Sequence, residues 1–456
     1  MSLIKSISGI RGTIGGFPGD NLTPVDIVEC TAAFGHWILE TGKKLSVVIG
    51  RDARISGNLV QTLVAQTLVA QGFHVMDLGL STTPTVEMAV TDLNASAGII
   101  ITASHNPIQW NALKFLNDKG EFISAEDGKQ ILDTIDRKTY KFQTVENLGY
   151  ISYPENTLEN HIDKILELPL VNVAAIKSRQ FKIVVDPVNS TGSLALGALL
   201  NKLGCNFSMI NDDLSGKFAH NPEPLPEHLT QLSETVVIEN ADLGITVDPD
   251  VDRLAFINED GSMFGEEYTL VAVADYVLSK KGGNTVSNLS STRALKDVTE
   301  KHGHSYFAAA VGEVNVVSKM KEVNAMIGGE GNGGIILPEL HYGRDALVGV
   351  ALFLSLLAER NVSMSSLKGS YPAYEMAKSK IELVPGMNVL ELLDRVRNAF
   401  KNEKINDIDG VKIDFASGWV HLRQSNTEPI IRLYAEATDK EEVKRLCSLV
   451  ENVIQQ

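Results

Sequence analysis

Hydrophobic and polar positions repeat the same order three times along the chain. In each repeat a short apolar run is followed by a polar loop, a helix-like segment and a glycine, over residues 45–72, 181–204 and 284–303. Each repeat is half of a βαβ unit, which implies a parallel sheet with covering helices. The uneven spacing excludes a solenoid. The pattern therefore predicts three similar α/β domains in series, although any large α/β protein contains such units.

The last part of the chain has a different pattern. A helical period over 389–400 precedes two alternating runs between 411 and 423, which predict a hairpin. Another strand is predicted over 430–434, and the acidic residues from Asp439 favour the start of a terminal helix. This is the pattern of a small α+β domain. The predicted domains are 1–152, 153–257 and 258–370, all α/β with mixed or parallel sheets, and the α+β domain 371–456.

Composition narrows the class of protein. The chain has 456 residues, more than one core usually organises, with 44% hydrophobic and 21% charged residues. No apolar run is long enough to span a membrane, and the first residues lack the apolar stretch of an export signal, so we expect a cytoplasmic protein. The three cysteines are widely spaced without a C-x-x-C pair, which indicates free thiols.

The net charge limits the kinds of partner that the chain can bind. The formal net charge is −16, with no basic stripe to offset it, and this argues against a nucleic-acid partner. An anionic substrate must then be held by local cations, backbone N–H groups or a metal ion, against an unfavourable overall field.

A polar loop, Thr102-Ala103-Ser104-His105-Asn106-Pro107, follows the apolar run 97–101. A buried strand that ends in this way delivers the Ser104 hydroxyl to a sheet edge, where ligands bind in α/β proteins. A hydroxyl there acts as a nucleophile or carries a phosphoryl group. The adjacent His105 suggests a hydrolase, but a catalytic triad is a spatial arrangement and the chain has no G-x-S-x-G elbow.

Three carboxylates alternate in Asp248-Pro249-Asp250-Val251-Asp252-Arg253, directly after the apolar run 243–247. In an extended loop they can converge on one hard cation, and three oxygen ligands with an external phosphate oxygen suit Mg²⁺. The alternatives are a solvated acidic turn, a nucleophilic aspartate of the haloacid-dehalogenase type, and an EF-hand loop that ends at Glu259. The EF-hand is disfavoured because Arg253 stands where its sharp turn needs glycine.

Two further loops carry groups that match polar ligands. The glycine-rich segment 328–334 permits close approach of a ligand, and its Glu330 and Asn332 match sugar hydroxyls. Arg423, with the hydroxyl and amide side chains of 424–429, can clasp a phosphate. Taken alone, each loop is more typical of a flexible or Asn-rich turn.

Five segments together, 9–13, 102–107, 248–253, 329–334 and 423–429, resemble the loops of the α-D-phosphohexomutase family. This family includes phosphoglucomutase, phosphomannomutase and phosphoglucosamine mutase. The resemblance keeps the order of the loops and covers essentially the whole chain. It implies three similar α/β domains and a smaller C-terminal α+β domain around one deep cleft, in agreement with the predicted organisation.

The resemblance also implies site residues. The implied catalytic residues are Arg11, Ser104, His105, Lys114 and Arg253; the metal ligands are Ser104, Asp248, Asp250 and Asp252; and the substrate-binding residues are Gly312, Glu330, Asn332, Arg423, Ser425, Asn426 and Thr427. Arg253 would stabilise the transferring phosphoryl group, and Lys114 or His105 would assist proton transfer. The loop at Arg423 would clasp the phosphate that does not react.

The implied activity is that of an isomerase. Ser104, as a phosphoserine bound to Mg²⁺, would give its phosphoryl group to the C1 or C6 hydroxyl of a monophosphosugar. The resulting hexose 1,6-bisphosphate would turn end for end and return its other phosphoryl group. The expected partner is a small phosphosugar, without nucleic acid or membrane, and the chain is expected to be a monomer or homodimer.

The residues alone leave the sugar and the kind of function open. The sugar can be a glucosamine, glucose or mannose phosphate. Two other functions also fit: a phosphosugar phosphatase with Asp248 as nucleophile, and a non-catalytic phosphosugar-binding protein.

Overall fold

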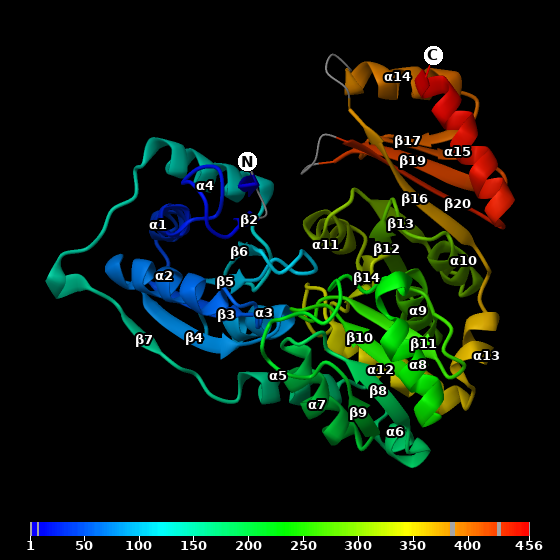
Figure 1. The fold of residues 1–456 in the computed structure, drawn as a ribbon, viewed down its shortest axis with the longest axis horizontal. Coiled ribbons are helices and arrows are strands. Elements are labelled where there is room, and N and C mark those ends of the chain that lie inside the picture. The colour runs from blue at the N-terminus through cyan, green and yellow to red at the C-terminus, as the bar shows by residue number, and fades with distance from the viewer. Residues whose placement is uncertain (1, 7–8, 384–387, 426–429, 456) are drawn as a thin grey trace. The chain divides into compact units, whose positions relative to one another are not determined.

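The computed structural model describes residues 2–6, 9–383, 388–425 and 430–455. The chain divides into two compact units (Figure 1). The first comprises Met1–Thr269 with Asn332–Ser365, and the second comprises Leu270–Gly331 with Ser366–Gln456.

A seven-stranded mixed sheet forms the N-terminal part of the first unit. Its strands are β1 (Ile4–Ser6), β2 (Gly9–Thr13), β3 (Ser46–Arg51), β4 (His74–Leu80), β5 (Ala97–Ile101), β6 (Trp110–Leu116) and β7 (Tyr150–Ser152). They lie in the order β1-β2-β6-β5-β3-β4-β7. β5, β3, β4 and β7 are parallel neighbours, whereas β6, β2 and β1 extend the sheet with antiparallel pairs.

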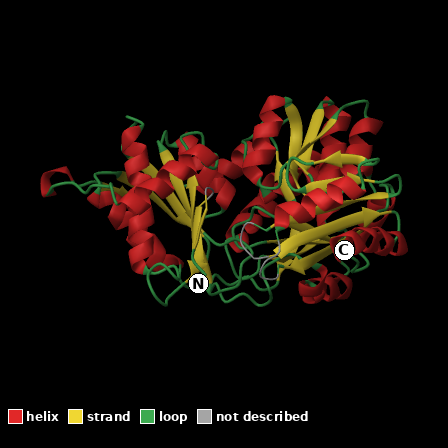
Figure 2. Ribbon diagram, turned by 90° about the horizontal axis from the view of Figure 1, so that it is seen from above, coloured by secondary structure: helices red, strands yellow, loops and turns green. Residues whose placement is uncertain are grey.

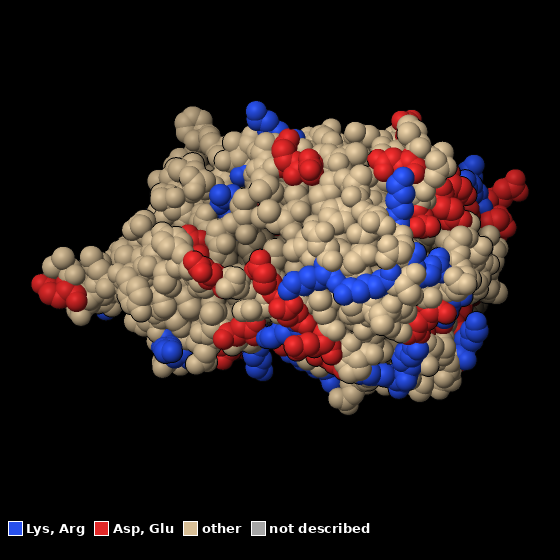
Figure 3. Space-filling view, turned by 90° about the horizontal axis from the view of Figure 1, so that it is seen from below, with Lys and Arg blue, Asp and Glu red and all other residues tan. Residues whose placement is uncertain are grey.

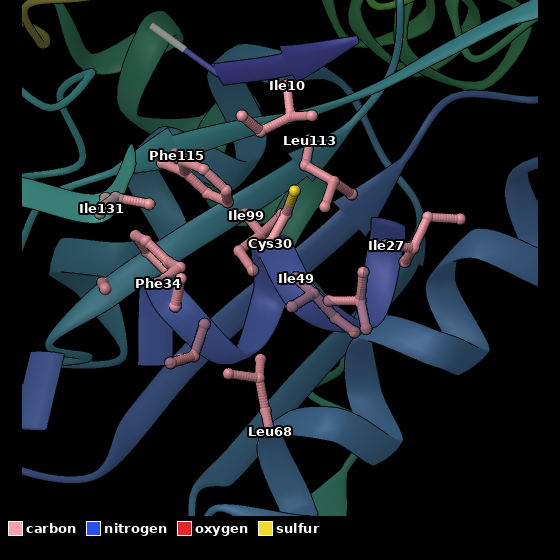
Figure 4. Packing of buried hydrophobic residues seen from close by; sticks show 14 of the residues in the cluster. Ile10, Ile27, Cys30, Phe34, Ile49, Leu68, Ile99, Leu113, Phe115 and Ile131 are labelled. Carbon is pink, nitrogen blue, oxygen red and sulfur yellow. The ribbon is translucent and has the colours of Figure 1, made fainter. Parts of the chain in front are cut away.

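Helices cover both faces of this sheet (Figure 2). They are α1 (Pro24–Glu40), α2 (Gly57–Ala70), α3 (Thr83–Asp92) and α4 (Ala125–Arg137). Alternation along β3 explains the arrangement, because Ile49 packs in one core cluster with Phe34 of α1, whereas Val48 packs in another with Val86 of α3. Figure 4 shows the first cluster, in which Phe34 stacks on Phe115 with ring centroids 4.4 Å apart.

A four-stranded sheet forms the rest of the first unit. Its strands are β8 (Lys182–Asp186), β9 (Asn206–Met209), β10 (Leu243–Val247) and β11 (Leu254–Asn258), in the order β11-β10-β8-β9. β8, β9 and β10 are parallel, and β11 pairs antiparallel with β10. The other elements are α5 (Thr157–Glu167), α6 (Val173–Arg179), α7 (Gly192–Leu203), α8 (Thr230–Glu239), β15 (Gly334–Ile336), α12 (Ala346–Arg360) and the 3₁₀ turns Val145–Asn147 and Pro226–His228.

The second unit contains a parallel core and an antiparallel C-terminal sheet. In the core, β12 (Asn284–Asn288) lies between β13 (Tyr306–Ala309) and β14 (Ala325–Glu330). The C-terminal sheet has the order β16-β20-β19-β18-β17, with β16 (Glu375–Glu382), β17 (Lys404–Asn406), β18 (Val411–Asp414), β19 (Gly418–Gln424) and β20 (Ile430–Ala437). The helices are α9 (Glu266–Lys281), α10 (Ala294–Lys301), α11 (Glu313–Glu322), α13 (Met364–Gly369), α14 (Val389–Ala399) and α15 (Lys440–Gln455), of which α9 and α13 begin in the first unit.

The predicted fold class is confirmed, with three α/β parts and a smaller C-terminal α+β part. Each predicted βαβ half supplies a parallel pair: β3 with β4, β8 with β9 and β12 with β13. The predicted hairpin is β18 and β19, in which Ile413 pairs with Val420. Strand β16 was not predicted, because half-exposed and charged positions dominate it and leave no apolar run.

Within the described residues, no helix is both long enough and apolar enough to cross a membrane. On the face drawn in Figure 3, basic side chains are bordered by acidic ones. Ion pairs such as that of Lys43 with Asp118, 2.7 Å apart, distribute charge in this way.

Candidate active site

Strand β5 delivers Ser104 to the carboxyl edge of the first sheet. All five residues of β5 are buried, and the chain leaves the sheet at Thr102. Ser104 has φ = +50°, a left-handed conformation that is uncommon outside glycine and is held here by side-chain bonds. Its N–H donates to Thr102 Oγ1 (2.9 Å), and that hydroxyl donates to Asp52 Oδ2 (2.7 Å).

Arg54 holds the loop that carries Ser104. Its guanidinium donates to the carbonyl oxygens of Ser104, Asn106 (2.6 Å), Pro107 (2.9 Å) and Trp110 (3.1 Å). The arginine is almost fully buried, and the Asp52 carboxylate, 3.0 Å from its Nε, balances its charge. A rigid fork of donors that satisfies four carbonyls defines the loop's position closely.

The aspartate loop, residues 248–253, follows β10 in the second sheet. Asp248 Oδ2 accepts a hydrogen bond of 2.6 Å from Ser104 Oγ, so the two loops meet within the first unit. Asp248 Oδ1 accepts from the backbone N–H groups of Asp252 (3.2 Å) and Arg253 (3.1 Å), which closes the turn. The Pro249 carbonyl is held by two further hydroxyls, from Ser190 and Thr191.

Cationic and hydroxyl groups surround the other two carboxylates. Lys114 Nζ lies 2.8 Å from Asp250 Oδ2 and 3.7 Å from Asp252 Oδ2. Arg344 Nη2 lies 2.7 Å from Asp252 Oδ2, and the Thr83 hydroxyl donates to Asp250 Oδ2 at 2.7 Å. The loop thus has three fully buried carboxylates with a cation on two of them.

The pKa shifts follow from this packing. Burial, then Asp250 and Asp252, raise the pKa of Asp248 well above its usual value, more than Arg253 and Ser104 lower it. Burial alone raises the pKa of Asp250, but Lys114 and Thr83 outweigh burial and leave it below its usual value. Burial lowers the pKa of Lys114, yet the two carboxylates raise it above that of an ordinary lysine. Such a cluster favours a further bound cation.

The donor set fits a hard divalent cation. One carboxylate oxygen from each of Asp248, Asp250 and Asp252 lies within 4.8 Å of the others. Among the described residues, Asp250 Oδ1 and Asp252 Oδ1 are buried and have no hydrogen-bond partner. Buried lone pairs without donors are those that a metal ion satisfies, and carboxylate oxygens are the ligands that Mg²⁺ prefers.

The EF-hand alternative is excluded. The aspartate loop lies between β10 and β11, which pair antiparallel, whereas an EF-hand loop joins two helices. Glu259 is occupied elsewhere, since its carboxylate accepts from the N–H (3.0 Å) and hydroxyl (2.5 Å) of Ser365.

Three more residues approach Ser104 from its own unit. His105 Nδ1 lies 3.3 Å from Ser104 Oγ, and burial followed by Arg253 lowers the pKa of His105 well below its usual value. Glu223 Oε1 lies 3.5 Å from Arg253 Nη1 and 3.9 Å from His105 Nε2. The Glu223 carboxylate therefore lies between the Arg253 guanidinium and the His105 imidazole.

Arg11 lies on the antiparallel edge of the sheet. β2 pairs with β6 so that Arg11 is opposite Ala112. Lys114 is two residues further along β6, so Arg11 and Lys114 are on the same face of the sheet. The structure thus groups Ser104, His105, Lys114, the aspartate loop and Arg253 by direct contacts, and Arg11 by register.

The substrate-binding candidates are divided between the units. In the second unit, Glu330 Oε1 accepts from Asn288 Nδ2 (2.9 Å) and from the N–H of Gly312 (3.1 Å), which has φ = +113°. Arg423 is the last residue but one of β19, two residues before the buried Ser425. Asn332 belongs to the first unit.

Two of the candidates, Asn426 and Thr427, lie outside the described residues. Their part in a phosphate clasp stays a prediction.

Sequence analysis missed several residues of the site. Asp52 and Arg54 follow β3, the neighbour of β5, so charged residues directly after that strand were an available signal. Thr83, Glu223 and Arg344 carried no local signal, because each reaches the site from a segment remote in sequence.

Family models confirm the resemblance that the loops indicate. Those of phosphoglucomutase/phosphomannomutase alpha/beta/alpha domains I, II and III match residues 3–142, 159–261 and 265–374, and that of the C-terminal domain matches residues 381–453. The chain belongs to the phosphoglucomutase/phosphomannomutase family. Members of this family are phosphohexomutases, which are isomerases. The domain boundaries predicted from the sequence pattern stay predictions.

Individual relatives cover the chain from end to end. A phosphoglucomutase/phosphomannomutase of Thermococcus kodakarensis is 34% identical over 448 residues, 96% of each chain. A phosphoglucosamine/phosphogalactosamine mutase of Sulfurisphaera tokodaii is 31% identical over 464 residues, with 100% of both chains covered. A crystal structure of a phosphoglucomutase/phosphomannomutase family protein from Burkholderia thailandensis has a TM-score of 0.87 at 25% identity, covering 99% of this chain and 97% of that one.

Proposed function

We propose that this chain is a Mg²⁺-dependent phosphohexomutase that interconverts hexose 1-phosphates and hexose 6-phosphates through a phosphoserine at Ser104. The observation that carries the proposal is the hydrogen bond of 2.6 Å between Ser104 Oγ and Asp248 Oδ2. It joins a hydroxyl on a closely held loop to a carboxylate cluster with unsatisfied buried oxygens. A serine phosphorylated at this place has its charge next to a cation site.

In each half of the reaction a phosphoryl group moves between Ser104 Oγ and a sugar hydroxyl. In the first half the Oγ–P bond breaks, a bond forms from phosphorus to the sugar oxygen, and the proton of the sugar hydroxyl passes to Ser104 Oγ. In the second half the other sugar O–P bond breaks, the Oγ–P bond forms again, and the proton of the Ser104 hydroxyl passes to the released sugar oxygen. We assign transfer of these protons to His105, 3.3 Å from Ser104 Oγ. Lys114, charged in its ion pair with Asp250, and Arg253 stabilise the charge of the transferring group.

Asp248, Asp250 and Asp252 would hold Mg²⁺, which when bound neutralises charge on the phosphoserine oxygens. The carboxylates themselves are positioned by Lys114, Arg344 and Thr83. Because these partners are already paired with the carboxylates, the site needs little reorganisation as charge shifts during transfer.

The rest of the substrate is assigned to the remaining loops. Glu330, whose carboxylate is oriented by Asn288 and Gly312, and Asn332 would bind sugar hydroxyls. Arg423 and Ser425, with Asn426 and Thr427, would bind the phosphate that does not react. The intermediate is a hexose 1,6-bisphosphate, which reorients before it returns its other phosphoryl group to Ser104.

The names of the relatives support a set of candidate sugars and not a single one. One relative is a phosphoglucomutase/phosphomannomutase and another a phosphoglucosamine/phosphogalactosamine mutase. Glucose, mannose and glucosamine phosphates are therefore the substrates to compare.

The test is a mutase assay with Mg²⁺, each hexose phosphate and its 1,6-bisphosphate, on the native protein and Ser104→Ala. We expect isomerisation by the native protein and none by the variant, with the fold retained in circular dichroism. Ser178→Ala, an exposed serine on α6, is the control and should keep full activity. Isomerisation by Ser104→Ala would contradict the phosphoserine assignment.

The same assay separates the two alternatives. Net release of inorganic phosphate that survives in Ser104→Ala but not in Asp248→Asn would favour the phosphatase. Binding of the phosphosugar without turnover, even after Ser104 is phosphorylated, would favour a binding protein.

A further inference from the structure

A second cluster of potential metal ligands lies in the first unit, apart from the aspartate loop. It consists of His161 on α5, His341 in the segment before α12, and Asp345 at the N-cap of α12. One donor atom from each lies within 4.8 Å of the others. None of the three residues has a role in the proposed mutase mechanism, although Arg344, which contacts Asp252, directly precedes Asp345.

The distances within the cluster approach those of a tetrahedral site. Asp345 Oδ2 lies 3.0 Å from His161 Nε2 and 3.4 Å from His341 Nε2. Ligands bonded to Zn²⁺ at about 2.0–2.1 Å with tetrahedral angles are about 3.4 Å apart. Asp345 Oδ1 is already engaged, since it accepts from the N–H groups of Leu347 and Val348, which leaves Oδ2 directed at the two imidazoles.

The outer nitrogens of both imidazoles also have partners. His161 Nδ1 lies 3.0 Å from the Thr85 hydroxyl, and His341 Nδ1 lies 3.3 Å from Glu87 Oε2. Metal-binding histidines usually make a hydrogen bond, such as that of His161 with Thr85, through the ring nitrogen that does not bind the metal. The Glu87 carboxylate approaches His341 Nδ1 as an ion-pair contact on the corresponding side of the second ring. Thr85 and Glu87 are both on α3, so one helix orients both rings.

The charge of the cluster and its access to solvent also support a bound metal ion. Asp345 and Glu87 are both nearly fully buried, and two buried carboxylates need compensating positive charge. A pocket of about 520 Å³ is lined by Glu87 and His341 together with Lys119, Lys164 and Tyr342, so solvent reaches one side of the cluster. This gives an entry path and room for a water as fourth ligand.

We propose that His161, His341 and Asp345 bind a Zn²⁺ ion that joins α5, α12 and, through Thr85 and Glu87, α3. Two imidazole nitrogens and one carboxylate oxygen form a donor set suited to zinc rather than to Mg²⁺. α5 packs against both α3 and α12, so the ion connects elements that already form one core. Its role is to stabilise the first unit.

The test uses the full chain, freed of metal by a chelator and kept in excess Mg²⁺ so that the aspartate loop is filled. Cobalt(II) is the probe, because tetrahedral cobalt absorbs visible light strongly and zinc displaces it. We expect the band to saturate at one cobalt per chain and to disappear on addition of zinc. Zinc should also raise the thermal unfolding temperature of the metal-free protein.

Four variants locate the ion. His341→Asn removes a ligand that is partly accessible, and should abolish the band and the thermal shift. Glu87→Gln keeps all three ligands and should weaken zinc binding about 10–100-fold, the usual effect of losing an outer-shell partner. His302→Asn is the matched control, since His302 pairs with a buried aspartate, Asp275, at 2.7 Å outside the cluster, and should bind cobalt normally. The double variant Asp250→Asn/Asp252→Asn should also keep the band.

The outcomes are decisive even if His341→Asn is less stable, because Glu87→Gln changes affinity without removing a ligand. Absence of the band in the native protein would overturn the proposal and leave the cluster as a hydrogen-bonded network held by protons. An unchanged band in both His341→Asn and Glu87→Gln would also overturn it. So would loss of the band in Asp250→Asn/Asp252→Asn. None of these readings depends on mutase activity.

Discussion

Two clusters of buried charged groups, one in each unit, differ in how their polar atoms are satisfied. In the first unit the aspartate loop leaves Asp250 Oδ1 and Asp252 Oδ1 buried without a hydrogen-bond partner among the described residues. In the second unit a network around Lys412, His421 and Glu436 of the C-terminal sheet has a partner for each group that it buries.

In the closed network of the second unit, each buried polar group has a partner within the protein. Lys412 Nζ donates to the Leu289 carbonyl (2.7 Å) and lies 4.0 Å from the centroid of the Trp419 ring. Glu436 Oε1 accepts from Trp419 Nε1 at 2.8 Å and from the Arg293 N–H at 2.9 Å. The bonds of Lys412 with Leu289 and of Glu436 with Arg293 connect the C-terminal sheet to the loop after β12, so the network holds the second unit together.

His421 completes this network in its neutral form. Its Nδ1 lies 3.0 Å from the Ser290 hydroxyl and its Nε2 lies 2.6 Å from the Asp409 carbonyl. A carbonyl requires a proton on Nε2, so Nδ1 accepts from the hydroxyl. The comparison teaches that buried charge by itself does not mark a functional site. The unsatisfied carboxylate oxygens of the aspartate loop support one, because a bound cation would complete them.

The strongest test of this contrast removes a carboxylate with an unsatisfied oxygen. We expect Asp250→Asn to lower mutase activity about 10³-fold or more, since it removes a proposed metal ligand and the partner of Lys114. Initial rates at increasing Mg²⁺ measure the effect, and added Mg²⁺ should not restore full activity.

Asp186→Asn is the matched control for Asp250→Asn. Asp186 is also fully buried at the carboxyl end of a strand of the same sheet, but Asn211 and His220 satisfy its Oδ2. It should affect stability more than Mg²⁺ dependence. Equal losses of activity in the two variants would contradict the contrast between satisfied and unsatisfied carboxylates.

The next effect concerns the stability of the closed network at low pH. Burial, with Lys412 and Arg423 nearby, lowers the pKa of His421 from 6.5 to about 4, more than the Asp409 carbonyl and carboxylate raise it. The unfolded chain therefore binds this proton first as the pH falls. The stabilisation is complete above pH 6.5 and decreases toward pH 4, by about 3 kcal/mol in total.

Urea unfolding between pH 4 and 7 measures this loss, followed by the emission of Trp419 in a Trp37→Phe/Trp110→Phe background. His421→Gln should flatten the pH dependence, because glutamine does not titrate in this range. His36→Gln, on α1 of the first unit, should leave the Trp419 transition unchanged. A slope that persists in His421→Gln would assign the pH dependence to other groups.

A smaller effect is expected where a charge is kept but its geometry is changed. Arg54→Lys preserves the charge near Asp52 but cannot serve four loop carbonyls at once. We expect kcat to fall about 10²-fold, because displacement of Ser104 by about 1 Å is enough for such a loss. Arg51→Lys is the control, since Arg51 donates to one side chain among the described residues, that of Gln61. A change in KM alone would show that Arg54 does not position Ser104.

The smallest predicted effect belongs to the second unit. Arg423 Nε is buried and has no hydrogen-bond partner among the described residues, as expected of a group that awaits an anion. Arg423→Gln should raise KM about tenfold with little change in kcat, since it removes one charge-assisted bond to the non-reacting phosphate. Arg432→Gln, directly opposite on β20, is the control. A fall in kcat at unchanged KM would place Arg423 in the chemical step instead.

Much of the fold and part of the site could be predicted from the sequence. Strands β5 and β10 are continuous apolar runs, and the residues after them are polar, so the places of Ser104 and Asp248 followed from local patterns. Half-exposed strands such as β16 and β17 have no such pattern, since their pairing depends on neighbours in the sheet.

The sequence by itself determined the aspartate loop, because three alternating carboxylates in six residues share one turn whatever surrounds them. Only the tertiary structure decided which groups meet that turn: Ser104 from 144 residues earlier, and Arg344 from 92 residues later. It alone assembled His161 with His341 and Asp345, and Arg54 with the carbonyls after β5. The physical reason is the distance along the chain over which each kind of interaction acts. Backbone geometry depends on neighbours along the chain, whereas the convergence of distant side chains depends on how sheets and helices pack.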